Sequence, residues 1–272
     1  MISLNIILTA TIEPQINGGK FTSKERFKMY SDTLEYYSKV IGKKYPIFLF
    51  ENSSADLSDW IKFKDKLNLT VIQFNPSKSE NNDFDNNKGK GYNEFLMIKK
   101  GIQEISISNN KYERIYFLKI TGRYALLNIL DIIKEIEKNI MKHNYLFMGD
   151  IKDTCIYKLI GRDTLSSHWG DSRFFCAELN FYKNHMKECY KEMDDYLEGS
   201  WAEDYFLRFS RTNRKDKSFK FRFKTQVRFN GISGTLNSED INNPAKQADS
   251  KKNKIKADIR QILRYLFPNV WF

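Results

Sequence analysis

The chain has 272 residues, of which 41% are hydrophobic and 15% aromatic, a composition that excludes a wholly disordered protein. There are 45 Lys and Arg against 34 Asp and Glu, so the formal charge is +11. This charge favours an anionic partner such as a nucleotide, a phosphorylated lipid, an anionic membrane surface or a nucleic acid. Three cysteines without metal-ligand spacing indicate a reducing compartment.

The sequence shows no basic leader and no apolar run of the roughly 20 residues that a membrane-spanning helix needs. We therefore expect a cytoplasmic protein that is dissolved or peripheral on the inner face of the plasma membrane.

Short apolar strands alternate with helical segments in the first half of the chain. The expected strands are 2–12, 47–50, 70–74 and 115–118, and the expected helices are 21–41, 57–67 and 95–107. This alternation is typical of an α/β protein with a parallel, Rossmann-like sheet.

The second half continues with an expected helix at 130–143, strands at 145–148, 154–157 and 172–177, and a helix at 178–196. Within the basic stretch 208–228, Phe and Lys or Arg alternate over 219–224, which predicts a half-buried strand with a cationic outer face. We expect one domain over 1–236, then a polar linker and a basic amphipathic helix over 237–272.

The run 116–124, YFLKITGRY, begins as a buried strand and ends in Lys119, Thr121, Gly122 and Arg123. Ligands of open α/β sheets bind at the carboxyl ends of strands. Two cations beside a glycine, which lets backbone approach a ligand closely, suit a phosphate or a carboxylate. The alternative is a strand closed by a glycine turn, with both cations solvated.

A second candidate for an anion site is the segment 88–94, KGKGYNE, which precedes the expected helix at 95–107. The free N–H groups and the dipole of a helix N-terminus attract anions. The alternative is a glycine-rich turn with exposed lysines.

Several stretches together carry a family resemblance: ILTA at 7–10, Arg26 with Tyr30, ENS at 51–53, KGKGYNE at 88–94, KITGRY at 119–124, WAED at 201–204 and GISG at 231–234. Over residues 1–235 the chain resembles bacterial glycosyltransferases of GT-A-like fold that build surface polysaccharides, either capsule or lipopolysaccharide O-chains. The resemblance implies a mostly parallel sheet flanked by helices, and transfer of a hexosyl or related sugar.

The resemblance also implies roles for particular residues. The nucleotide-sugar donor is expected at Thr9, Ala10, Thr11, Arg26 and Glu51. Its diphosphate is expected at Lys88, Lys90, Lys119 and Arg123, with the backbone of Ser233 and Gly234 closing over it. The general base is expected to be Glu203 or Asp204, with Asp171 as a second candidate, and the acceptor is expected to contact Trp201, His168 and Trp169.

Structural roles compete with each of these assignments. The donor residues would otherwise be surface caps of strands and helices, the two acids would cap the N-terminus of a helix, and the glycine loop would form a hairpin.

One departure from the family concerns the metal. Many GT-A enzymes end the strand that matches 116–119 in an Asp-x-Asp that binds a divalent cation, whereas this chain has Thr121-Gly122-Arg123. Fixed Arg and Lys side chains can stabilise the charge of a departing phosphate in place of a metal. We therefore expect a metal-independent enzyme without a cofactor, and we keep Asp150 as the ligand if a divalent metal does bind.

The expected partners are a nucleotide-sugar donor and a glycan or polyprenyl-linked acceptor. The stretch 208–228 and the terminal helix could both face an anionic inner membrane, or the helix could instead pack on the catalytic domain. A rival function is nucleic-acid binding through 208–228, which is disfavoured because the cation–glycine clusters sit at the ends of inner strands. Another is a non-catalytic subunit that binds a sugar nucleotide.

Overall fold

The computed structural model describes residues 2–14, 21–75, 83–85, 87–108, 113–153, 168–230, 251–267 and 270. The chain divides into two compact units. The first unit comprises Met1–Ala125 and Ala177–Ala202, and the second comprises Leu126–Cys176 and Glu203–Phe272. The expected boundary between 236 and 237 falls outside the described residues and stays a prediction.

The helices and strands follow one another along the chain as β1 (Ile2–Ala10), α1 (Ser23–Val40), β2 (Ile47–Glu51), η1 (Ser58–Asp65), β3 (Leu69–Gln73), α2 (Gly89–Ser108), β4 (Arg114–Thr121), β5 (Ala125–Leu126), α3 (Ile129–His143), β6 (Phe147–Lys152), β7 (Trp169–Glu178), α5 (Leu179–Phe181), η4 (Tyr182–Met186), η5 (Cys189–Glu192), α6 (Ala202–Thr212), β8 (Phe219–Lys220), β9 (Phe229–Asn230) and α7 (Lys251–Leu266).

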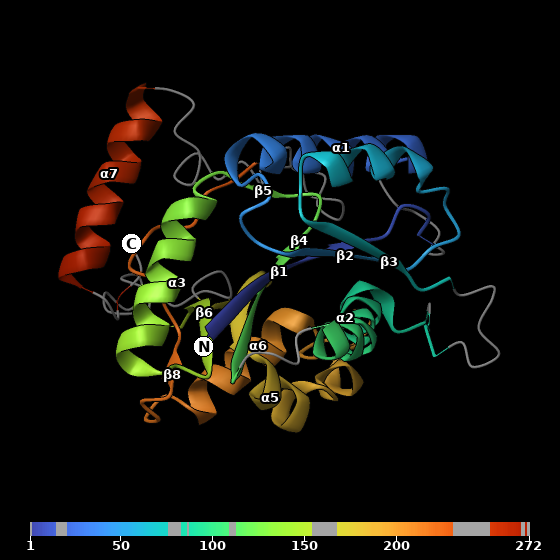
Figure 1. Cartoon of the computed structure of the whole chain (residues 1–272). Helices are drawn as coiled ribbons and strands as arrows, with labels where there is room; N and C mark the ends of the chain where they lie inside the picture. Colours follow the sequence, from blue (N-terminus) through green and yellow to red (C-terminus); the bar gives the residue numbers. More distant parts are fainter. Residues whose placement is uncertain are drawn as a thin grey trace. The chain divides into compact units, whose positions relative to one another are not determined.

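The first unit is built on parallel strands in the order β3-β2-β1-β4. The central strand β1 pairs on both sides, with Ile6 opposite Ile47 on β2 and opposite Leu118 on β4. Helix α1 lies on one face of these strands and α2 on the other (Figure 1). Because both faces are covered, the strands are nearly continuous runs of apolar residues. The expected α/β class, with a mostly parallel sheet flanked by helices, is confirmed.

Both ends of helix α1 are fixed by residues close to them in the sequence. Thr22 caps the N-terminus by accepting a hydrogen bond from the N–H of Glu25, whose carboxylate in turn accepts from the N–H of Thr22. Such a cap contributes about 1 kcal/mol of stability. The helix ends at Ile41, and Gly42 follows with φ of 58°, a left-handed conformation that favours glycine.

Four expectations about secondary structure were wrong. The segment 89–94 forms the first turns of α2 rather than a loop before it, and 57–67 contains only the short 3-10 helix η1. The expected single helix over 178–196 is broken into the short turns α5, η4 and η5. The expected strand over 219–224 is paired only at Phe219–Lys220. Beyond it, the N–H groups of Phe223, Lys224 and Thr225 donate to side-chain carboxylates instead of to a neighbouring strand.

The second unit has an aromatic core around β6 and β8, which are parallel, with Phe147 opposite Phe219. The ring of Phe147 lies 5.1 Å from Phe209 and 6.0 Å from Phe221, measured between centroids. Lys220 pairs with Glu135 of α3 at 2.6 Å, and both side chains are mostly buried. Phe221 and Lys220 are therefore engaged in contacts inside the unit, which weakens the nucleic-acid hypothesis.

Helix α7 forms where the sequence predicted a terminal helix, and it packs on the second unit. The described residues contain no helix that is long and apolar enough to cross a bilayer.

Candidate functional site

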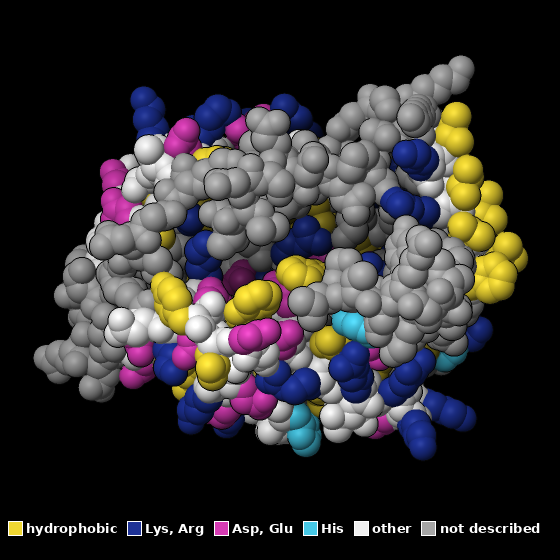
Figure 2. All heavy atoms as spheres, turned by 180° about the vertical axis from the view of Figure 1, so that it is seen from behind, with side chains coloured by type: hydrophobic (Ala, Val, Ile, Leu, Met, Phe, Trp, Pro, Cys, Tyr) yellow, Lys and Arg dark blue, Asp and Glu magenta, His cyan; other side chains and the backbone are white. Residues whose placement is uncertain are grey.

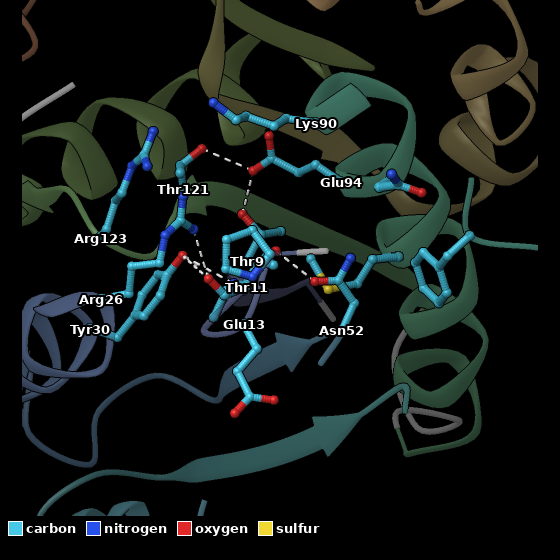
Figure 3. A pocket seen from close by; sticks show the side chains of 15 residues that line it. Thr9, Thr11, Glu13, Arg26, Tyr30, Asn52, Lys90, Glu94, Thr121 and Arg123 are labelled. Carbon is cyan, nitrogen blue, oxygen red and sulfur yellow. Dashed lines mark hydrogen bonds between the residues drawn. The ribbon is translucent and has the colours of Figure 1, made fainter. Parts of the chain in front are cut away.

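A cavity of about 100 Å³ opens in the first unit at the carboxyl ends of β1 and β4 (Figure 3). Strand ends of a parallel sheet are the usual ligand-binding edge. The cavity is lined by Thr9, Ala10, Thr11, Glu13, Pro14, Arg26, Tyr30, Asn52, Phe84, Lys90, Asn93, Glu94, Met97, Thr121 and Arg123.

Three cations reach this cavity from three different elements: Arg26 from α1, Lys90 from α2 and Arg123 from the end of β4. We call them the three cavity cations. Figure 3 shows their charged ends on one side of the cavity. The sequence predicted all three as donor-binding residues, together with Thr9, Ala10 and Thr11, and the structure brings these six residues together around one space.

The three cavity cations have few partners. Arg26 donates one hydrogen bond to the carbonyl of Thr11 at 2.8 Å, and the Arg123 guanidinium lies 4.9 Å from the ring centroid of Tyr124. The buried Nε atoms of Arg26 and Arg123 have no hydrogen-bond partner among the described residues. Among the residues that the structure describes, no carboxylate lies within ion-pair distance of Arg26, Lys90 or Arg123.

The electrostatics of the cavity follow from this arrangement. Burial, together with the charges of Arg123 and Arg26, lowers the pKa of the Lys90 amino group. Burial and the charge of Arg123 likewise lower the pKa of Arg26. Burial works against the charge of Arg123, but Tyr124, Tyr30 and Glu94 outweigh it and raise the pKa of its guanidinium. An anion would stabilise the three clustered cations further, and phosphate oxygens match guanidinium donors well.

Glu94 on α2 organises the floor of the cavity. Its Oε1 accepts hydrogen bonds from the hydroxyls of Thr9 and Thr121, the latter at 2.9 Å, and forms an ion pair with Lys119 at 2.8 Å. Burial opposes the charge, but Lys119 and the two hydroxyls outweigh it and lower the pKa of Glu94. Lys119, predicted to bind the diphosphate, is therefore fully buried behind the cavity and paired with Glu94.

Glu51 lies beside the cavity but does not line it. Its carboxylate accepts from the N–H groups of Ile12 at 3.0 Å and Ser53 at 2.8 Å, and from the Ser53 hydroxyl at 2.5 Å. The side chain is fully buried. It thus holds together the ends of β1 and β2, which shapes the cavity indirectly.

The N-terminus of α2 is occupied by a carboxylate of the chain itself. Asp195 accepts from the N–H of Lys90 at 2.6 Å and from the N–H of Gly91 at 3.3 Å. A side chain on Gly89 would collide with Asp195, and Gly89 has φ of 86°. The glycines of this segment, which the sequence presents as an anion site, therefore make room for Asp195.

Lys88 and Gly122 also have roles inside the protein. Lys88 pairs with Asp194 at 2.8 Å, is about half exposed and does not line the cavity. The N–H of Gly122 donates to the carbonyl of Thr9 at 2.8 Å, and a Cβ at position 122 would lie 2.8 Å from that oxygen. Gly122 thus lets the ends of β4 and β1 approach each other. Its lack of a side chain serves this contact and not the close approach of a ligand.

The three candidate bases do not line the cavity, and they lie in the second unit. Glu203 and Asp204 occupy the first turn of α6, as the sequence predicted, and Glu203 accepts from the hydroxyl of Ser172 at 2.8 Å. Asp171 is buried and binds both Nε and Nη2 of Arg173, at 2.8 and 2.6 Å. Its two oxygens are thus engaged, which makes Asp171 the weakest of the three candidates.

The expected acceptor residues are partly exposed. Trp201 is in the first unit and donates from its indole N–H to the carbonyl of Asp195 at 3.2 Å. In the second unit Trp169 begins β7, and the ring nitrogen Nδ1 of His168 lies 3.2 Å from Asp153. The predicted backbone contacts of Ser233 and Gly234 lie outside the described residues.

No group of three or more His, Cys, Asp or Glu side chains in the described ranges is arranged to hold a metal ion. Asp150, the reserve ligand, lies within β6 and is bound by Arg264.

Sequence reasoning missed several lining residues, chiefly Glu94, Asn52 and Thr121. A signal for Glu94 was present, because Lys90, Glu94 and Met97 are spaced four and three residues apart and so share one face of a helix. The sequence showed no comparable signal for Asn52, whose Oδ1 accepts from the Thr11 hydroxyl at 2.5 Å, because that pairing depends on neighbouring strands.

Comparison with known proteins gave structural neighbours only. No family model matches the sequence, and no curated protein matches it. The galactosyltransferase LgtC, crystallised with donor and acceptor sugar analogs, superposes with a TM-score of 0.38 and 9% identity, over 80% of this chain and 72% of LgtC. A cytidylyltransferase from Leptospira borgpetersenii superposes with a TM-score of 0.45 and 10% identity, over 99% and 98% of the two chains. Likeness at these scores carries no functional assignment.

Proposed function

We propose that this chain is a glycosyltransferase that moves a sugar from a nucleotide-activated donor to a hydroxyl group. The observation that carries the proposal is the set of three cavity cations, which converge at the carboxyl ends of β1 and β4 without a carboxylate partner among the described residues. A nucleotide sugar supplies the missing charge as its phosphates. The family resemblance in the same residues, Arg26, Lys90 and Arg123, supports this choice of ligand.

The transfer reaction requires the protein to stabilise the leaving group and to accept the proton of the acceptor hydroxyl. The acceptor oxygen bonds to the anomeric carbon while the bond from that carbon to the phosphate oxygen breaks, and the electron pair leaves with the nucleoside phosphate. Arg26, Lys90 and Arg123 stabilise the charge that grows on this leaving group, as fixed cations can do in a site with little water. The proton of the acceptor hydroxyl goes to a carboxylate general base.

For the base we propose Glu203 or Asp204. Both sit in the first turn of α6, and the dipole of a helix attracts negatively charged groups to that end. Asp171 is a less suitable choice because Arg173 binds both of its oxygens.

We further propose that the enzyme acts without a metal, since the three cavity cations can carry the charge-stabilising role of a divalent ion. The acceptor is a glycan or a polyprenyl-linked glycan of a bacterial surface polysaccharide, and the transferred sugar is a hexose or a related sugar. The statements about the acceptor and the transferred sugar are supported by the family resemblance alone.

The test is a panel of UDP-, GDP- and CMP-sugars, each assayed for thermal stabilisation and for hydrolysis or transfer, with EDTA and with Mn²⁺. A donor at 100 times its dissociation constant raises the unfolding free energy by about 2.7 kcal/mol. We expect one donor to bind and turn over in EDTA. Replacing the base, by Glu203→Gln or Asp204→Asn, should then lower turnover by about 100-fold or more while leaving donor binding intact.

Three outcomes would separate the rival functions. Binding without any turnover of any donor would indicate a non-catalytic sugar-nucleotide-binding subunit. Salt-sensitive binding of oligonucleotides without binding of any sugar nucleotide would indicate the nucleic-acid function. A strict requirement for Mn²⁺ would overturn metal independence alone.

A further inference from the structure

Helix α7 packs on the second unit through its polar side. Arg264 forms a buried ion pair with Asp150 of β6, with Nη1 at 3.0 Å and Nη2 at 3.2 Å from the two carboxylate oxygens. Gln261 donates to the carbonyl of Lys224 at 2.7 Å and accepts from the N–H of Gln226 at 2.8 Å. Side chains at 261 and 264 lie on the same helical face, so this polar face is the one that docks.

The apolar side of α7 faces outward. Ile255, Ile259, Ile262 and Leu266 are spaced four, three and four residues apart, which places them in one stripe along the helix. Their side chains are between 52% and 66% exposed. Figure 2 shows hydrophobic side chains following one another along α7, with Lys and Arg beside them. A helix of a globular domain normally buries such a stripe, so the packing of α7 is reversed.

The charge of α7 complements an anionic surface. The helix sequence contains Asp258 as its one acidic residue and six basic residues, Lys251, Lys252, Lys254, Lys256, Arg260 and Arg264. Asp150 neutralises Arg264, which leaves an excess of basic residues on a helix with an exposed apolar stripe. This combination is the signature of a helix that lies in the headgroup region of a bilayer.

We propose that the outward face of α7, formed by Ile255, Ile259, Ile262 and Leu266, docks the chain on an anionic bilayer. A second copy of the chain is the less favourable occupant, because each copy carries a formal charge of +11 and like charges repel. The bilayer supplies both an apolar layer for the isoleucines and negative headgroups for the lysines. The Arg264–Asp150 ion pair fixes which face of the helix the protein presents.

The proposal is tested by sedimentation of the full chain with vesicles of phosphatidylcholine alone or with 30% phosphatidylglycerol added, without any sugar nucleotide. We expect binding to the anionic vesicles only. Each basic residue near the surface strengthens binding roughly fivefold, so Lys252→Gln with Lys256→Gln should weaken it about 30-fold. Ile259→Glu with Ile262→Glu should weaken it at least tenfold, since apolar burial is lost as well.

A matched control is Ile61→Glu, because Ile61 is also an exposed isoleucine, 60% accessible, but lies on η1 of the first unit. This variant should bind vesicles as the unchanged protein does. The isoleucines that are replaced are all exposed, and circular dichroism verifies that each variant is folded.

Two results would overturn the proposal. The first is binding that does not depend on phosphatidylglycerol or that survives Ile259→Glu with Ile262→Glu. The second is a dimer in sedimentation velocity that dissociates in that double variant, which would make a second copy the occupant of the face. No sugar-nucleotide donor is present in these measurements. A failure to bind vesicles would therefore not contradict the proposed transferase activity, and a failure of transferase activity would not contradict vesicle binding.

Discussion

The two units use their buried cations in opposite ways. In the second unit, Arg264 and Lys220 each meet a carboxylate, Asp150 and Glu135, at 3.0 and 2.6 Å. In the first unit, Arg26 and Arg123 face a cavity with no carboxylate of the described residues in ion-pair range. A buried cation paired with a carboxylate is part of the architecture, whereas one without a carboxylate partner is a candidate for binding an anionic ligand.

The same distinction holds within the first unit. Lys119 and Lys88 were predicted to bind the diphosphate together with Lys90 and Arg123, yet both have internal partners, Glu94 and Asp194. The sequence alone could not separate the two groups, because the partner carboxylate is 25 positions away for Lys119 and more than a hundred for Lys88.

The largest expected loss of unfolding free energy comes from breaking the ion pair between Arg264 and Asp150 in the second unit. Asp150→Ala leaves Arg264 charged and buried without its partner, and such a loss costs about 3–5 kcal/mol. Urea unfolding should show this loss. The double variant Asp150→Leu with Arg264→Met should recover most of it, because it removes both charges. A double variant as unstable as Asp150→Ala would show that the ion pair is not what anchors α7.

The next effect concerns the paired cation behind the cavity. Glu94→Gln removes the charge that faces the fully buried Lys119 but can still accept a hydrogen bond, so we expect a loss of about 1–3 kcal/mol in unfolding free energy. Because the pKa of Glu94 is lowered in the fold, its stabilisation is present above the ordinary Glu pKa and is lost as pH falls through the folded value. The difference between the two proteins should therefore shrink in acid, and a constant difference would contradict this assignment.

A smaller effect is expected at the N-terminus of α2. Asp195→Ala removes the acceptor for the N–H groups of Lys90 and Gly91, which costs about 1 kcal/mol for a helix cap. Asp195→Asn keeps an acceptor oxygen and should cost less. Thermal unfolding of the two variants side by side checks this order. Equal losses would mean that the charge of Asp195, which both variants remove, matters rather than the acceptor oxygen.

The smallest effect has the opposite sign. Lys90→Met should raise the unfolding free energy at neutral pH, by less than about 1 kcal/mol, since it relieves repulsion by Arg26 and Arg123. The pKa of Lys90 is lowered in the fold, so the unfolded chain binds more protons between the two pKa values and the stability of the unchanged protein rises with pH there. The advantage of Lys90→Met should thus fade in alkaline solution. A less stable Lys90→Met protein would show that Lys90 is already paired.

The sequence predicted the elements whose signals are local. The apolar runs of β1 and β4 and the helical periodicity of α1 and α3 all lie within the element itself. The breaks in 178–196 and the early start of α2 depend on contacts between distant residues, such as Asp195 with Lys90. Periodicity cannot report such contacts.

The candidate site divides in the same way. Residues next to strand ends, such as Thr9, Thr11 and Arg123, could be predicted because strand ends are recognisable and parallel strands bring their ends together. Whether Lys88 or Lys90 faces the cavity depends on distant contacts at the start of α2, where Lys88 binds Asp194 and the N–H of Lys90 donates to Asp195. Only the structure shows those contacts.

The central claim is that the three cavity cations hold the phosphates of a nucleotide. Calorimetric titration with UDP, GDP and CMP, in EDTA, tests it most directly on the unchanged protein, on Arg123→Met and on Lys88→Met. We predict that at least one nucleotide binds, that Arg123→Met weakens it by roughly 10- to 100-fold and that Lys88→Met leaves it unchanged. Equal affinity in the unchanged protein and Arg123→Met, or no binding of any of the three, would contradict the claim.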